Sequence, residues 1–125
     1  MTTGTWLNHG NLSIPESPNY NLLDPNLLII PNGYSNTLFL SFGSFWEDIF
    51  QVPMSDPLTV AGAPVQLEYN KTSGVPLGDD PSEGSFQFMW PINGKTYYYL
   101  FFSSGNCCTP GYKVCDFFKH PMVYF

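Results

Sequence analysis

Short apolar or alternating segments, separated by turn residues, recur along the whole chain. Twelve Pro and eleven Gly interrupt these segments, and no long helical periodicity is evident. Segments of this length, bounded by Gly and Pro, are typical of β-strands. The pattern predicts an all-β protein, with strands near 27–30, 37–43, 49–52, 65–69, 85–90, 96–102 and 111–115.

The clearest unit is a predicted hairpin in the second half of the chain. Phe86, Phe88 and Trp90 alternate with other residues and share one face, which is the period of a half-buried strand. Asn93-Gly94 supplies the positive φ angles of a tight turn. Thr96–Phe102 then runs apolar and aromatic without alternation, which indicates a strand covered on both faces.

Two acids lie where predicted strands begin. Asp24 precedes Pro25 at the entry to a buried strand, and spacing alone favours a local Asx turn there. Glu83 precedes the hairpin; as an alternative, it is one more acid of the polar loop that carries Asp79 and Asp80. Paired carboxylates in opposite roles carry out glycoside hydrolysis, so a functional interpretation requires Asp24 and Glu83 to converge. Burial among the hairpin aromatics would then help to raise the pKa of the acid.

Composition restricts the classes of partner. A chain of 125 residues with 43% hydrophobic, 18% aromatic and 11% charged residues is expected to form one ordered domain. A net charge of -6 with four basic residues argues against nucleic acid or an anionic membrane as partner. The charge does not argue against a neutral sugar as a ligand, because such a ligand needs no charge match. No apolar run reaches transmembrane length, and Met1–Trp6 shows no signal-peptide pattern.

Two further groups of residues are candidates for metal binding and for sugar stacking. Cys107, Cys108, Cys115 and His120 are candidate zinc ligands, but neighbouring strand residues point to opposite faces. We therefore predict no metal and no cofactor. The aromatic residues of Ser44-Phe45-Trp46 have two interpretations, a platform for a sugar ring or core packing, and core packing is the commoner role.

Five ordered motifs resemble glycoside hydrolase family 43, and most closely its fungal endo-1,5-α-L-arabinanases. The resemblance covers roughly residues 4–114, and the order of the motifs makes it specific. The motifs are Asn21–Asn26, Leu40–Trp46, Glu83–Phe86, Tyr97–Cys108 and Tyr112–Val114.

This resemblance implies a five-bladed β-propeller that hydrolyses arabinan with inversion and needs no cofactor. Glu83 matches the general acid of the family, and Asp24 matches the acid that tunes its pKa and orients the substrate. Segments that line the substrate groove are matched by Asn21, Ser44, Phe45 and Trp46. The implied partner is a plant cell-wall polysaccharide, arabinan or its oligosaccharides, and the implied location is extracellular.

Two parts of the family pattern have no match in this chain. These are the general base, an Asp of the first blade, and the last blades with their His near a bound ion. The resemblance therefore implies a fragment of about one and a half to two blades. We expect the end of a preceding blade at 1–20, one blade at 21–70 and an incomplete blade at 71–125.

Three hypotheses remain: a hydrolase fragment lacking its base, a non-catalytic sugar-binding or interaction module, and a truncated product without function. With blades missing, one face and one edge of the Tyr97–Phe102 strand should also lie open.

Overall fold

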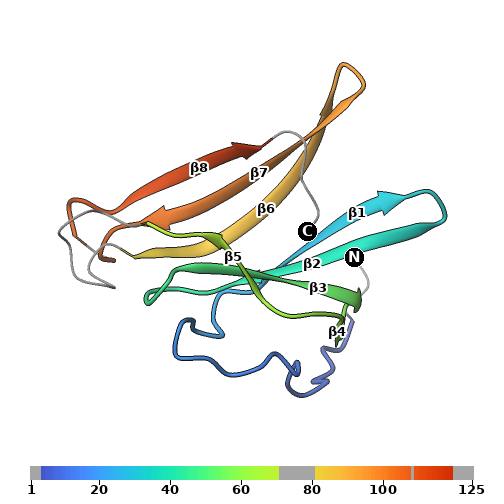
Figure 1. Cartoon of the computed structure of the whole chain (residues 1–125), viewed down its shortest axis with the longest axis horizontal. Helices are drawn as coiled ribbons and strands as arrows, with labels where there is room; N and C mark the ends of the chain where they lie inside the picture. Colours follow the sequence, from blue (N-terminus) through green and yellow to red (C-terminus); the bar gives the residue numbers. More distant parts are fainter. Residues whose placement is uncertain (1–3, 71–80, 108, 120–125) are drawn as a thin grey trace.

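The structure is a computed structural model that describes residues 4–70, 81–107 and 109–119. Two antiparallel β-sheets lie one above the other, and the segment before the first strand runs beneath the lower sheet (Figure 1). The described residues contain no helix, so the all-β prediction is confirmed. Within the same residues no helix is long and apolar enough to cross a membrane.

The first sheet contains five strands in the order β1-β2-β3-β4, with β5 also paired to β3. Its strands are β1 (Asn26–Asn32), β2 (Ser35–Phe42), β3 (Ile49–Asp56), β4 (Thr59–Val60) and β5 (Val65–Glu68). The four predicted strands of this region are all present. Strand β4 was missed because two residues are too short to carry a periodic pattern.

The second sheet contains β6 (Ser82–Ile92), β7 (Lys95–Ser104) and β8 (Lys113–Lys119), with β7 in the centre. Strands β6 and β7 form the predicted hairpin. Asn93 and Gly94 have φ angles of 51° and 75°, as a two-residue turn with both central residues in the left-handed region requires. The turn predicted from Asn-Gly is therefore confirmed.

One face of the first sheet packs on the segment that precedes it. Its buried cluster consists of Leu38, Leu40, Phe42, Phe50, Val52 and Met54. Leu12, Ile14 and Tyr20 cover this cluster. The Tyr20 ring lies 5.3 Å from that of Phe42 in an edge-on arrangement, and its hydroxyl donates to the Pro15 carbonyl at 2.6 Å. The irregular segment is thus held by apolar burial and one satisfied hydroxyl.

The other face of the first sheet packs on the second sheet. A smaller apolar cluster joins the two, formed by Ile49, Leu100 and Phe102 with Leu67 and Cys115 beside it. The rest of the contact is polar. Ser85 donates its hydroxyl to that of Ser41 at 2.9 Å, and the Gln87 backbone N–H donates to the Asn26 side-chain oxygen at 2.8 Å.

This polar contact reverses the expected orientation of β6. Phe86, Phe88 and Trp90 do share one face, but that face is exposed, while Ser85 and Gln87 are buried against the first sheet. The prediction of a half-buried strand is therefore confirmed, but the buried side of β6 is its polar side and not its aromatic side. The bond to Ser41 satisfies the buried Ser85 hydroxyl, whereas the side-chain oxygen of Gln87 has no hydrogen-bond partner among the described residues.

Strand β7 also departs from expectation in two ways. Leu100 and Phe102 are buried on the inner face, whereas Phe101 on the outer face is 37% exposed, so the expected cover on both faces is not found among the described residues. The open face that a missing blade would leave is therefore present. The open strand edge that we expected is not found, because β7 pairs with β6 on one side and with β8 on the other.

Gly43 provides a test of this packing. It has a φ of 120°, and a Cβ there would collide with the backbone carbonyl oxygen of Asp48. Gly33 has a φ of 61° but open space around it. We expect Gly43→Ala to lower the free energy of unfolding by about 3 kcal/mol or more, and Gly33→Ala by about 1 kcal/mol. Urea denaturation measures both, and equal losses would contradict the described packing.

Candidate functional site

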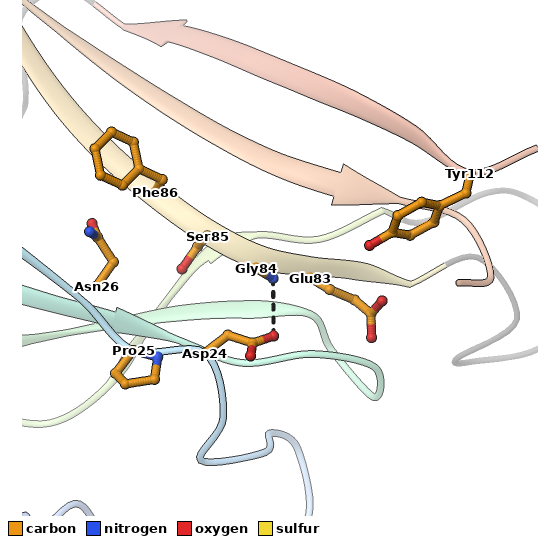
Figure 2. Close-up of a pocket in the computed structure, with 8 residues that line it drawn as sticks. All are labelled: Asp24, Pro25, Asn26, Glu83, Gly84, Ser85, Phe86 and Tyr112. Atoms are coloured by element: carbon orange, nitrogen blue, oxygen red, sulfur yellow. Dashed lines mark hydrogen bonds between the residues drawn. The ribbon is translucent and has the colours of Figure 1, made fainter. Parts of the chain in front are cut away.

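A pocket of about 400 Å³ opens where β6 begins, beside the segment that leads into β1. Figure 2 shows Asp24 on the segment that leads into β1, Glu83 on β6 and Tyr112 just before β8. Its lining consists of Asp24, Pro25, Asn26, Glu83, Gly84, Ser85, Phe86 and Tyr112. The structure thus brings together the two acids that sequence reasoning singled out.

A β-bulge in β6 shapes this pocket. Glu83 pairs with Ser103 and Phe86 with Phe101, so Gly84 and Ser85 together oppose one residue of β7. Gly84 has a φ of 61°, which a glycine adopts without strain. A bulge leaves backbone groups without a partner in the ladder and redirects side chains. Here it frees the Gly84 N–H and turns the strand at the residue that follows Glu83.

Asp24 accepts a hydrogen bond from that backbone group. Its Oδ2 atom lies 3.2 Å from the Gly84 nitrogen, a contact that spans 60 residues (Figure 2). Asp24 itself has a φ of 52° and is exposed. The Asp24 carboxylate therefore links the segment before β1 to β6 at the pocket. This long-range bond differs from the local Asx turn that spacing alone favoured.

Glu83 is held from the first sheet by Ser44. Ser44 Oγ donates to Glu83 Oε1 at 2.7 Å, and Ser44 is only 3% exposed. Asn21 in turn donates its side-chain amide to the Ser44 carbonyl at 2.8 Å. Asn21, Ser44 and Glu83 therefore form one connected hydrogen-bonded chain, in which the buried serine fixes one oxygen of the carboxylate.

Phe45 and Trp46 continue from Ser44 along the loop between β2 and β3. Both have left-handed backbones, with φ of 55° and 49°, and their side chains are 36% and 45% exposed. Non-glycine residues in this region are uncommon and concentrate at functional sites. The pair does not line the pocket itself.

The expected surroundings of Glu83 are not observed. Phe86, Phe88 and Trp90 are 53%, 40% and 55% exposed and share the outer face of β6. Glu83 is half-buried and bonded to Ser44 instead. The prediction that these three aromatics bury the acid is therefore wrong, because the inward side of β6 is its polar side.

Asp48 is the residue of this region that sequence reasoning missed. It is 3% exposed, and its two carboxylate oxygens accept the backbone N–H groups of Ser82 at 2.9 Å and Asn70 at 2.8 Å. Ser82 is the first residue of β6 and directly precedes Glu83. The sequence offers one signal for its role: Asp48 directly precedes a predicted buried strand, where a charge without a partner is unfavourable.

A second buried acid, Glu68, lies beside Asp48. Burial raises the pKa of Glu68 to about 7, the neighbouring Asp48 charge adds to this increase, and the Ser82 hydroxyl acts against it. Among the described residues the Oε2 atom of Glu68 has no hydrogen-bond partner. A buried carboxyl oxygen without a hydrogen-bond partner favours the protonated form of Glu68.

The cysteine and histidine candidates do not form a site within the described part of the chain. There, no group of three or more His, Cys, Asp or Glu residues is arranged to hold a metal ion. Cys107 is exposed, whereas Cys115 packs against the cluster between the sheets. Cys108 and His120 lie outside the described residues.

Comparison with known proteins relates this geometry to one group of enzymes. The chain is 44% identical over 111 residues to arabinan endo-1,5-α-L-arabinosidase A of Aspergillus aculeatus, covering 86% of this chain and 30% of that protein. It is 40% identical over 111 residues to the protein of the same name from Aspergillus niger, with the same shares covered. The chain thus spans about 30% of the length of these curated relatives. No protein-family model matches it.

A solved structure is similar as well. The exo-1,5-α-L-arabinanase from a bovine ruminal metagenomic library matches 92% of this chain and 37% of its own, with a TM-score of 0.66 and 29% identity. The predicted resemblance to arabinanases is therefore confirmed. So is the predicted fold, part of a five-bladed β-propeller.

The pKa of Glu68 predicts how stability depends on pH. The folded chain binds a proton on the Glu68 carboxyl more tightly than the unfolded chain does, because the pKa of Glu68 in the unfolded chain is near its ordinary value of 4.5. The stabilisation is complete below pH 4.5 and is lost as the pH rises towards 7. Between pH 5 and 8 we expect the free energy of unfolding to fall by roughly 1–2 kcal/mol from this residue, after allowance for solvent.

Urea denaturation at several pH values tests this, with Glu68→Gln expected to remove most of the decrease. Asp56→Asn is the matched control. A hydrogen bond from the Leu58 N–H lowers the pKa of this exposed acid, so it titrates below the window. A wild-type profile that rises over pH 5–8, or one that Glu68→Gln leaves unchanged, would contradict the assignment.

Proposed function

We propose that this chain is a catalytic piece of an inverting glycoside hydrolase of family 43 that acts on 1,5-α-L-arabinan. The observation that carries the proposal is the convergence of Asp24 and Glu83 on one pocket. Both lie within motifs that resemble the fungal enzymes, and the relatives named for this activity are 40–44% identical.

In this proposal Glu83 is the general acid, which protonates the glycosidic oxygen as the bond breaks. Ser44 holds one carboxylate oxygen at 2.7 Å, so the other oxygen can carry the proton towards the pocket. Asp24 tunes the pKa of the acid and orients the sugar. Its bond to the Gly84 N–H fixes it beside the residue next to Glu83.

Phe45 and Trp46 are proposed to contact a sugar ring, since exposed aromatic rings stack on the apolar face of a furanose. Asn21 supports the same loop through its bond to the Ser44 carbonyl. Inversion also requires a general base that activates water on the opposite side of the sugar. No residue of this chain matches the base that the resemblance implies, so we propose that the chain alone does not turn over arabinan.

The natural setting proposed is extracellular, with plant cell-wall arabinan or its oligosaccharides as partner and no cofactor. We propose that residues 21–70 and 71–125 belong to consecutive blades and that 1–20 end a preceding one. Endo-cleavage is preferred over exo-cleavage because the more similar relatives carry the endo name, at 44% identity against 29% for the exo enzyme.

A second candidate is a sugar-binding module without turnover. The observation that favours it is the exposed Phe45-Trp46 pair together with the unmatched base. The two candidates differ in what happens once a base is supplied.

A chimera separates them. The matched 111-residue segment of the Aspergillus aculeatus enzyme is replaced by the corresponding segment of this chain. We expect the chimera to release oligosaccharides from linear arabinan and the isolated chain to release none. Glu83→Gln in the chimera should lower kcat about 10²- to 10⁴-fold, because the proton donor is lost.

Glu16→Gln is the control, since this exposed acid lies away from the pocket and should leave kcat unchanged. Circular dichroism checks that each chimera folds. A folded but inactive chimera would favour the binding module. An unaffected Glu83→Gln chimera, or product release by the isolated chain, would overturn the assignment of the acid or of the missing base.

A further inference from the structure

Two buried acids lie near the pocket without lining it, and the proposed chemistry does not use them. Asp48 directly precedes β3 and is 3% exposed, while Glu68 ends β5 and is 8% exposed. Register places Glu68 opposite Ile49, the residue that follows Asp48. Both carboxyls therefore lie in the interior, and Asp48 contacts the start of β6.

The pair is joined to the pocket through the first residue of β6. Asp48 accepts the backbone N–H of Ser82 at 2.9 Å, and Ser82 is fully buried. The next residue is Glu83, whose Oε1 atom accepts the Ser44 hydroxyl at 2.7 Å. One peptide unit thus separates the Asp48 contact from the acid of the pocket. A displacement of Ser82 would draw Glu83 away from Ser44.

Hydrogen bonding around the pair is incomplete. Both Asp48 oxygens accept backbone N–H groups, those of Ser82 and Asn70. Glu68 Oε2 and Ser82 Oγ are buried and have no hydrogen-bond partner among the described residues. A neutral carboxyl with one unpaired oxygen costs far less to bury than a carboxylate does, because a buried charge requires compensation. The surroundings therefore suit a protonated Glu68 next to an ionised Asp48.

Within the described part of the chain, the charge that acts on the Glu68 carboxyl is that of Asp48. Burial raises the pKa of Glu68 to about 7, and this like charge adds to the increase. Strand β6 contributes Glu83, which is bonded to the loop before β3. Strand β8 contributes Lys113, which is exposed, and Cys115, which packs on the cluster between the sheets.

We propose that Glu68 is a positioning residue for Glu83, because the start of β6 stays in place only while the Glu68 carboxyl carries a proton. The inference rests on the proposed function, in which Glu83 is the proton donor. With Glu68 protonated, Asp48 is the single charge of the pair and binds the Ser82 N–H. With Glu68 ionised, two buried carboxylates repel each other, which weakens the contact with Ser82. Glu83 then loses its alignment with Ser44.

NMR spectroscopy of the 125-residue chain tests the positioning without reference to catalysis. Between pH 5 and 8 we expect the amide resonances of Ser82 and Gly84 to shift with a midpoint near the pKa of Glu68, about 7. Glu68→Gln, which resembles the protonated acid, should abolish both shifts. The wild-type titration requires no variant to fold. The Leu58 amide is the internal control, since its acceptor Asp56 is an exposed acid whose pKa that bond lowers.

The chimera described above measures the consequence for catalysis. The ratio of kcat for Glu68→Gln to kcat for the unmodified chimera cancels the titration of Glu83 itself. This ratio should be near one at pH 6 and about fivefold to tenfold at pH 8, because a group with a pKa of about 7 is mostly deprotonated there. Glu16→Gln makes the same chemical change at an exposed position and should give a ratio near one throughout.

Three results would overturn the proposal. They are a Ser82 resonance that stays constant between pH 5 and 8, a shift that Glu68→Gln leaves in place, and an active chimera whose kcat ratio stays near one at pH 8. A folded chimera that is inactive at every pH would contradict the proposed function instead. The amide titration of the chain would then decide the inference by itself.

Discussion

The position of the candidate site depends on how one buried carboxylate joins the two sheets. Asp48, directly before β3, accepts the backbone N–H of Ser82 at the start of β6, and its second oxygen accepts the Asn70 N–H. A buried carboxylate is tolerated only when its oxygens are bonded, so the chain must bring these backbone groups to it. Because Glu83 follows Ser82, the acid of the pocket is located by this contact.

The same requirement explains why β6 has its aromatic side outward. Ser85 faces the first sheet, where the Ser41 hydroxyl accepts its hydrogen bond, and the Gln87 backbone N–H bonds to the Asn26 side chain of β1. The bulge at Gly84 then turns the strand so that Glu83 reaches Ser44 while the Gly84 N–H reaches Asp24. The consequence is a polar contact between sheets at the site and an aromatic surface on the opposite side.

Local patterns predicted the elements well. The Asn93-Gly94 turn, the strands around it and the four main strands before it all follow from period and turn chemistry. The meeting of Asp24 with Glu83 was predictable only through the family resemblance, since the two are far apart in sequence. The orientation of β6 was not predictable from alternation, because periodicity identifies two faces but not which one is buried. Asp48 and Glu68 were missed for a related reason: neither an acid in a loop nor an acid at the end of a short strand carries a sign of the distant parts of the chain that will bury it.

Amide hydrogen exchange at Ser82 and Gly84 tests most directly whether Asp48 and Asp24 join the sheets at the site. The account predicts slow exchange at both amides in the wild-type chain. It further predicts that Asp48→Ala accelerates both at least about tenfold, while Asp56→Ala, which alters an exposed turn, does not. Exchange at Ser82 as fast as in an exposed peptide, or unchanged by Asp48→Ala, would contradict it.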